Sequence, residues 1–363
     1  MPSNAILQKN MFRDDFNGIF AAMRLCKDIC VFLEGKGIGC SVENVGAFEV
    51  ISTCLESGQT RAVLPVEIKA RNISEAEVQQ QEMQKTISVL TVRHGSYPLI
   101  ITEDRWIVQN DMMKKRLLSH LEIFFPIYAR NCEVKRIDKS MAAAFLKANH
   151  SYGDAACRYR YGLFVKRHTG HLAATAGSGL YCPGTLVAVA TFSNARKWVK
   201  GDKTIRSYEW TRYASLPGIR VTGGMGKLLE TFIQDVHPDD IMSYADLEWS
   251  EGSVYVQLGF TLEGKKGPVT FMVDDEWRRF PVKPGMTTSK GADEKPGMTT
   301  SKGADEKPGM TVLKRADEKP GVRALEVDGA ADEDGKASRG IFQNFGSRKY
   351  RLKLTEYDQA YDE

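Results

Sequence analysis

Hydrophobic and polar positions follow two different periods in the second half of the chain. Three short runs, rich in β-branched and aromatic residues, are typical of strands: TLVAVATFS (185–193), SYEWTRYASL (207–216) and DIMSYADL (240–247). Three runs have helical spacing or small-residue content that predicts helices: SMAAAFLKANH capped by Ser140, MGKLLETFIQDV, and SEGSVYVQLGF ending at Gly259. This alternation predicts an α/β fold with a mixed sheet.

The first 130 residues carry a weaker pattern of the same kind. Expected strands are AVLPVEIKA (62–70) and PLIITEDRW (98–106); expected helices begin near 14, 74 and 109. We therefore expect a smaller N-terminal α/β domain over 1–130, and a second domain over 131–282 plus 340–356.

A tandem repeat separates the last strands. KPGMTTSKGADE occurs at 283–294 and again at 295–306, and a degraded copy fills 307–318. These copies have almost no apolar surface to bury, so residues 283–338 are predicted to be a disordered insertion. The flanking strand-like runs, GPVTFMVD and KYRLKL, predict a hairpin whose connection holds the repeats.

Composition narrows the class of protein only slightly. Hydrophobic residues make up 42% and charged residues 26% of the 363 residues, and the net charge is +4, which is ordinary for a soluble domain protein. No apolar run of eighteen residues predicts a membrane span. Seven cysteines without framework spacing favour reduced thiols and a cytoplasmic location.

A glycine-rich turn stands directly before one predicted helix. Gly223, Gly224 and Gly226 precede the stripe that begins at Leu228. A helix N-terminus offers unpaired N–H groups and partial positive charge, and glycines let an anion approach the backbone closely. This arrangement favours phosphate binding, with a plain tight turn as the alternative. The spacing matches neither a Walker loop nor the dinucleotide fingerprint.

The block around this turn resembles the GNAT acyltransferase superfamily, through VTGGMG (221–226) and the later Y-x-x-x-G-F that starts at Tyr255. The resemblance covers about 140–282 and the final strand, and it implies a mostly antiparallel, twisted mixed sheet flanked by helices. Val221 stands where the family has Arg or Gln. The resemblance implies acetyl-CoA or another acyl-CoA as cofactor, held at Val221, Gly223, Gly224, Met225, Gly226 and Lys227.

The same resemblance implies the catalytic groups. Glu209 stands where family members place a general base, and Tyr255 where they place a general acid. Asp246, at the end of the next strand, is a third candidate, since open α/β sheets place ligands at strand ends. For Glu209 a surface position, for Tyr255 core packing, and for Asp246 a helix cap are the alternatives. No metal site is expected.

A closer likeness is to the GNAT-like half of phage-type proteins that follows a homing-nuclease-like domain, and to the Mom-type DNA-modifying proteins, through ANH (148–150) and SYAD (243–246). Glu67 and Lys69 form an E-x-K pair of the kind that nuclease metal sites use. A surface strand with alternating charge is the simpler interpretation of that pair. A nuclease would require metal-dependent cleavage that is lost on Glu67→Ala.

A basic segment at 113–170 points to nucleic acid. It contains twelve Lys and Arg but four Asp and Glu, and RYRYGLF (158–164) interleaves arginine with aromatic residues. Such mixtures suit phosphate contact and base stacking. The candidate substrate-binding residues are Asn149, His150, Arg158, Arg160 and Arg212.

Two functions are compatible with these features. The leading hypothesis is an N-acyltransferase that moves an acyl group from acyl-CoA to an amine, on nucleic acid or on a small metabolite. The rival is a nucleic-acid-binding module that kept the fold and lost the cofactor. Val221 favours the rival, whereas Glu209, Tyr255 and the glycines favour the enzyme.

Overall fold

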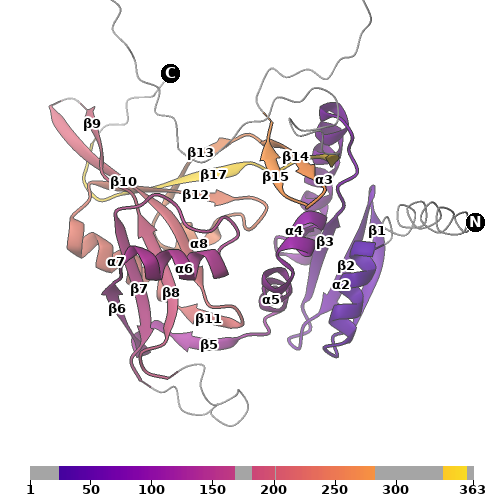
Figure 1. Cartoon of the computed structure of the whole chain (residues 1–363), viewed down its shortest axis with the longest axis horizontal. Coiled ribbons are helices and arrows are strands. Elements are labelled where there is room, and N and C mark those ends of the chain that lie inside the picture. The colour runs from indigo at the N-terminus through magenta and orange to yellow at the C-terminus, as the bar shows by residue number, and fades with distance from the viewer. Residues whose placement is uncertain (1–23, 168–181, 201, 283–337, 358–363) are drawn as a thin grey trace, which may run out of the picture.

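The computed structural model describes residues 24–167, 182–200, 202–282 and 338–357. The predicted repeat insertion lies outside these residues, apart from Ser338. Within them the chain is a mixed α/β protein whose sheets are mostly antiparallel. Two units lie side by side, and a small three-stranded sheet covers one of them (Figure 1).

The N-terminal unit is a four-stranded sheet in the order β1-β2-β3-β4, with β3 and β4 parallel. Apolar side chains point to both faces of this sheet. One core lies against α3, and the other lies against α2, α4 and α5. The elements are α2 (Arg24–Glu34), β1 (Cys40–Val45), β2 (Phe48–Cys54), β3 (Thr60–Val66), α3 (Ile73–His94), β4 (Leu99–Thr102), α4 (Glu103–Val108) and α5 (Asn110–His120).

The C-terminal unit is built on a larger sheet in the order β13-β17-β12-β10-β8-β7-β6, with β9 also paired to β10. Among its described strands, β10 and β12 are the only parallel neighbours. Its strands are β6 (Cys132–Arg136), β7 (Tyr159–Val165), β8 (Leu186–Phe192), β9 (Arg196–Lys200), β10 (Lys203–Ser215), β12 (Asp240–Asp246), β13 (Thr261–Lys266) and β17 (Ser347–Lys353).

Helices cover this sheet, and the strongest apolar stripe is the one on α7. Leu228, Leu229 and Phe232 are buried there, and the Phe232 ring stacks on Phe192 with centroids 3.9 Å apart. A two-stranded parallel sheet leads into α7. The remaining elements are α6 (Lys139–Asn149), α7 (Gly224–Val236), α8 (Ser253–Gln257), β5 (Phe125–Tyr128), β11 (Ile219–Thr222) and the 3-10 turn η1 (Ala129–Asn131).

The predicted cap of α6 is wrong. The N-cap is Asp138, whose Oδ1 accepts a hydrogen bond from the Met141 backbone N–H at 2.8 Å. The Ser140 hydroxyl donates to the same carboxylate at 3.0 Å. A carboxylate at this place also interacts favourably with the helix dipole, so the helix starts two residues earlier than a serine cap would allow.

The last strands divide differently from the expected hairpin. The strand in GPVTFMVD is β14 (Thr270–Asp274), which pairs with β15 (Arg279–Pro281) and β16 (Ser338–Gln343) and not with KYRLKL. The latter lies in β17, between β12 and β13. Val273 and Phe342 are buried in the N-terminal core, so β14–β16 pack with that unit, although they lie far from it in the sequence.

Candidate functional site

The parallel strands β10 and β12 separate part-way along their length. They are paired at three positions, Ser207↔Asp240, Tyr208↔Ile241 and Glu209↔Met242. The register of β10 against β8 then shifts between Trp210 and Arg212, and no later β10–β12 pair forms along the described strands. The strands therefore form an opening in the middle of the sheet, and Glu209 lies where it begins.

A cavity of about 670 Å³, here called the strand cavity, lies along this opening. All three predicted catalytic residues line it: Glu209, Tyr255 and Asp246. They come from β10, α8 and the end of β12, which are separate in the sequence. The fold thus brings together the groups that the sequence marked one by one.

A second cavity, of about 900 Å³ and here called the turn cavity, lies in front of the glycine-rich turn. Gly223 adopts a φ of 76°, which is the left-handed conformation that favours glycine, and α7 begins directly after it. The first bond of the helix runs from Lys227 N to Gly223 O. Helix geometry leaves the N–H groups of the preceding positions without intrahelical acceptors.

The presence of glycine at positions 224 and 226 of this turn has different explanations. A Cβ at Gly224 would lie 2.8 Å from Cγ1 of Val221, so the packing requires glycine there. A Cβ at Gly226 would meet only Leu258 Cδ2, at 3.4 Å, which a side chain can accommodate. Glycine in a helix costs roughly 1 kcal/mol relative to alanine. The fold itself therefore does not account for Gly226, whose backbone lines the turn cavity.

The two cavities adjoin. Tyr213, Met225 and Val254 line both of them. Residues of the N-terminal unit, among them Arg61 and Tyr97, form the far wall of the turn cavity. An elongated ligand could therefore place an anionic group at the start of α7 and a reactive group beside Glu209.

The Tyr255 hydroxyl belongs to a short hydrogen-bonded chain. Ser243 Oγ lies 2.9 Å from it and 3.1 Å from the Trp210 carbonyl oxygen, and its single proton can be donated to either. Where Ser243 donates to Tyr255, the phenol keeps its own proton for the cavity. Burial raises the pKa of Tyr255, so the phenol stays protonated. It can therefore act as a proton donor in the strand cavity.

Both carboxylate oxygens of Asp246 accept hydrogen bonds. The Tyr152 hydroxyl donates to its Oδ2 at 2.6 Å, and the Glu248 backbone N–H donates to its Oδ1 at 2.9 Å. Burial raises the pKa of Asp246, and the nearby charge of Glu248 raises it further. The contact with Glu248 N–H fixes the turn that follows β12, and it is not the N-cap of α8, which is Gly252.

Glu209 is the least constrained of the three groups. It is half-buried, and its backbone N–H donates to Ser193 Oγ at 2.9 Å. Arg212 lines the same cavity; burial lowers its pKa, whereas the charge of Glu209 raises it. A carboxylate at the mouth of the opening can attract an ammonium substrate and accept its proton.

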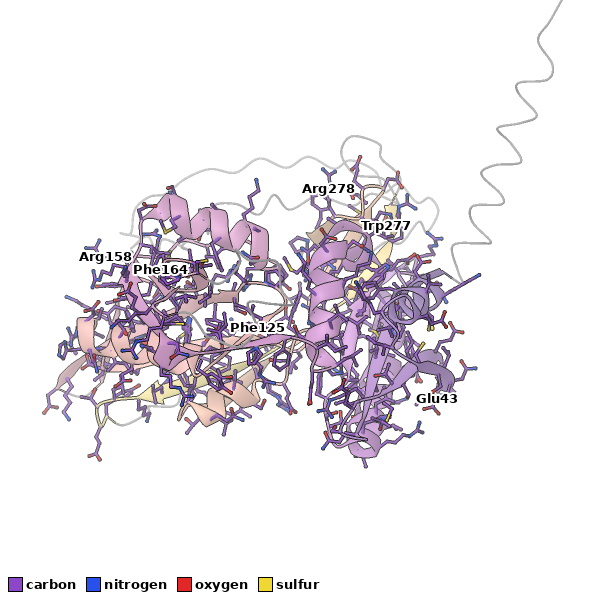
Figure 2. The ribbon with its side chains drawn as sticks, turned by 90° about the horizontal axis from the view of Figure 1, so that it is seen from below. Glu43, Phe125, Arg158, Phe164, Trp277 and Arg278 are labelled. Atoms are coloured by element: carbon purple, nitrogen blue, oxygen red, sulfur yellow. The ribbon has the colours of Figure 1, made fainter. Side chains whose placement is uncertain are left out.

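The predicted substrate-binding residues separate into two groups. Asn149, His150 and Arg212 line the strand cavity. Burial lowers the pKa of His150 to about 4, and its Nδ1 accepts a hydrogen bond from Tyr152 N. Arg158 and Arg160 line neither cavity. Arg158 is exposed at the end of the C-terminal unit that faces away from the N-terminal unit (Figure 2).

Among the predicted cofactor residues, Lys227 has a different environment. Its Nζ donates to the carbonyl oxygens of Ala129 and Cys132, at 3.0 and 2.6 Å, and the residue lines neither cavity. The side chain therefore ties α7 to η1 and β6. Val221 and the residues from Gly223 to Gly226 all line the turn cavity, as the phosphate-binding interpretation requires.

A buried charge cluster next to Asp246 was not predicted. Glu248 is 1% exposed, and it accepts from Arg105 Nε at 2.5 Å and from Arg279 Nη1 at 2.7 Å. Arg279 Nε also donates to Asp104 Oδ2 at 2.6 Å. Tyr152, whose ring lies under the Arg105 guanidinium group, was not predicted either. These residues come from distant parts of the chain, and no local pattern marks them.

Glu67 and Lys69 lie outside both cavities and form an ion pair with each other. Within the described ranges, no three or more His, Cys, Asp and Glu side chains are grouped so that they could hold a metal ion. The same part of the chain contains no helix that is long and apolar enough to cross a membrane.

Comparison with known proteins gives little further information. No family model matches the chain, and no curated protein matches it. Among solved structures, it is similar to a chain in one titled "The crystal structure of KacTA-DNA complex", with 15% identity and a TM-score of 0.24, over 37% of this chain and 86% of that chain. A similarity at this level supports no conclusion about fold or function.

Proposed function

We propose that this protein is a GNAT-fold N-acyltransferase that binds acetyl-CoA or another acyl-CoA and transfers the acyl group to an amine. The observation that carries the proposal is the joining of two cavities: one faces the glycine turn of α7, and the other follows the opening between β10 and β12. This arrangement fits a ligand with a pyrophosphate in its middle and a thioester at its end.

The turn would hold the pyrophosphate. The free N–H groups at the start of α7 and its partial positive charge attract an anion. Gly226, which the packing does not require, leaves the backbone open to such a group. Arg220, exposed on β11, lines the same cavity and adds a cation one residue before Val221, where the family has Arg or Gln.

The strand cavity would hold the reacting atoms. The amine loses a proton and its nitrogen attacks the thioester carbonyl; the C–N bond forms, the C–S bond breaks, and the sulfur leaves as a thiolate that needs a proton. Glu209, which opens onto the cavity, is proposed as the base. Tyr255, protonated and next to Ser243, is proposed as the acid.

Asp246 is proposed to contact the acceptor amine and not to take its proton. Both of its carboxylate oxygens already accept hydrogen bonds, from Tyr152 and from Glu248 N–H. Asn149, His150 and Arg212 line the same cavity and are proposed to contact the acceptor. The acceptor class that we propose is an amine on nucleic acid or on a small metabolite.

Calorimetric titration of acetyl-CoA into the protein tests the cofactor part of this proposal. We expect Gly226→Asp to abolish binding, because a carboxylate in the first turn repels the pyrophosphate even though it suits the helix dipole. Gly226→Ala is the comparison variant: its methyl group takes up space at the turn but adds no charge, so we expect it to weaken binding less than Gly226→Asp.

Two results would contradict the proposal. If the folded parent protein does not bind acetyl-CoA, longer acyl-CoA or free CoA, the cofactor assignment fails and the rival nucleic-acid-binding module gains support. If Gly226→Asp binds as tightly as the parent, the ligand lies elsewhere and the glycine turn is only a tight turn.

A further inference from the structure

The outer part of the β9–β10 hairpin, residues 196–206, is a basic and exposed projection that lies outside the proposed site. Residues 196–206 contain five basic side chains and one acidic one, Asp202. The hairpin extends beyond the large sheet, away from the N-terminal unit (Figure 1). Since β9 pairs with β10 alone, its other edge is not covered by any described strand.

Trp198 is the unexpected residue of this hairpin. Its side chain is 45% exposed, although tryptophan is one of the most costly residues to leave in water. It is directly opposite Ile205, which is 3% exposed, so it stands at the edge of the core without entering it. The fold therefore buries part of this side chain against the edge of the core and leaves the rest open to a ligand.

Cations flank this ring on the same face. Residues two apart in a strand share a face, so Arg196 lies on the face of Trp198. On β10, Lys203 lies two residues from Ile205, the cross-strand partner of Trp198, and so shares that face as well. Lys203 Nζ contacts only a backbone carbonyl, that of Glu356 at 3.1 Å, among its described neighbours, so its charge is not neutralised there.

We propose that the β9–β10 hairpin binds single-stranded nucleic acid, with a base stacked on Trp198 and the flanking phosphates held by Arg196 and Lys203. An aromatic platform between cations suits an unpaired base and its two phosphates. A duplex keeps its bases stacked inside, so it would use the cations but not the ring. The inference stands independently of the proposed acyltransferase activity.

The experiment measures the anisotropy of a fluorescent single-stranded oligonucleotide, titrated with the full-length protein over a series of salt concentrations. We expect Trp198→Ala to weaken binding about tenfold or more, because stacking of one base on an aromatic ring has that value. Trp198→Phe keeps an aromatic face and should recover most of the affinity. Both substitutions are at an exposed position and should fold.

The charges are tested separately. Replacing Arg196 and Lys203 together by Gln should lower the slope of log affinity against log salt by about 1.4, because each phosphate contact on a single strand contributes about 0.7. The matched control replaces two exposed lysines elsewhere, Lys27 and Lys265, and has the same net charge. We expect the control to retain both affinity and slope.

Four outcomes would overturn the inference. Equal weakening by the control double variant would show that binding depends on net charge only. Unchanged binding by Trp198→Ala, or tighter binding to the matched duplex, would remove the stacking role. Binding to vesicles with anionic lipid, without binding to the oligonucleotide, would assign the hairpin to a membrane surface instead. Acetyl-CoA titration of the same variants should be unaffected.

Discussion

At the scale of single residues, the buried Glu248 is the side chain whose substitution should change the free energy of unfolding most clearly. Burial alone would raise the pKa of this carboxyl group, but Arg279 and Arg105 lower it to about 2. A carboxylate that joins two buried guanidinium groups cannot be removed without leaving them uncompensated. The backbone N–H of the same residue donates to Asp246, so the side chain of Glu248 also fixes the segment that holds Asp246 in the strand cavity.

We predict that Glu248→Gln lowers the free energy of unfolding by about 3–5 kcal/mol at neutral pH, which urea titration measures. The folded pKa lies below the ordinary value of 4.5, so the carboxylate stabilises the parent fully above about pH 4.5 and progressively less as the pH falls toward 2. The difference between parent and variant should shrink over that window. Glu56→Gln, at an exposed position, is the control; an equal loss there would refute the assignment.

At the scale of an element, the start of α7 shows how a binding turn is built. The left-handed Gly223 reverses the chain after β11, and Gly224 packs against Val221 across that turn. The backbone conformation explains Gly223 and packing explains Gly224, whereas neither of these explains Gly226. A test on stability can therefore separate the packing glycine from the one that faces the cavity.

We predict that Gly224→Ala destabilises the protein by about 1–3 kcal/mol, because its Cβ would overlap Val221 Cγ1 at 2.8 Å. Gly226→Ala should be neutral or stabilise by up to about 1 kcal/mol, because alanine is the better helix former. Urea unfolding of both variants measures this difference. The double variant Val221→Ala, Gly224→Ala should recover part of the loss; if it does not, strain in the turn and not the overlap is the cause.

The elements that the sequence predicted well are those with a strong local pattern. β8, β12 and α7 lie where alternation or helical spacing placed them, within a few residues. Strand pairing was less accessible, because β17 joins β12 from about a hundred residues away and the alternation of KYRLKL does not specify a partner. The cap at Asp138 was missed because Ser140 carries a similar local signal.

From the sequence, the candidate site could be predicted only at residues that belong to a local motif. Glycines before a helix and a tyrosine before G-F are local signals, and these residues line the two cavities. Tyr152 and the charge cluster have no such signal, because a buried ion pair between residues more than a hundred positions apart depends on packing alone. Their place beside Asp246 is a property of the assembled fold.

At the scale of the whole molecule, the two units are joined by an ion pair and by hydrogen bonds, and both of them line the turn cavity. Arg105 on α4 pairs with Glu248 after β12, and Arg116 on α5 donates to the carbonyl oxygens of Glu248 and Trp249. The turn cavity has walls from both units. If one unit unfolded alone, the buried charges of the other would lose their partners, so we expect the units to unfold together.

One partly buried histidine in each unit has a strongly lowered pKa in the folded protein. Burial and the charge of Arg116 lower the pKa of His120 to about 4. Burial likewise lowers the pKa of His150 to about 4, with contributions from Arg212 and from Arg105 of the other unit. The unfolded chain binds protons at these residues near pH 6.5, whereas the folded chain does not.

Stability should therefore be complete above about pH 6.5 and fall as the pH decreases toward 4, because the unfolded state binds more protons there. Urea midpoints between pH 7 and 5 measure the effect before ordinary carboxyl groups titrate. We predict that His120→Gln and His150→Gln each flatten this dependence, and that the double variant flattens it most.

His237→Asn, at an exposed position, is the control. If the control flattens the curve equally, or if the single variants leave it unchanged, the two histidine rings do not cause the loss. A flattening by only one variant would assign the acid sensitivity of the joined molecule to the unit that contains it.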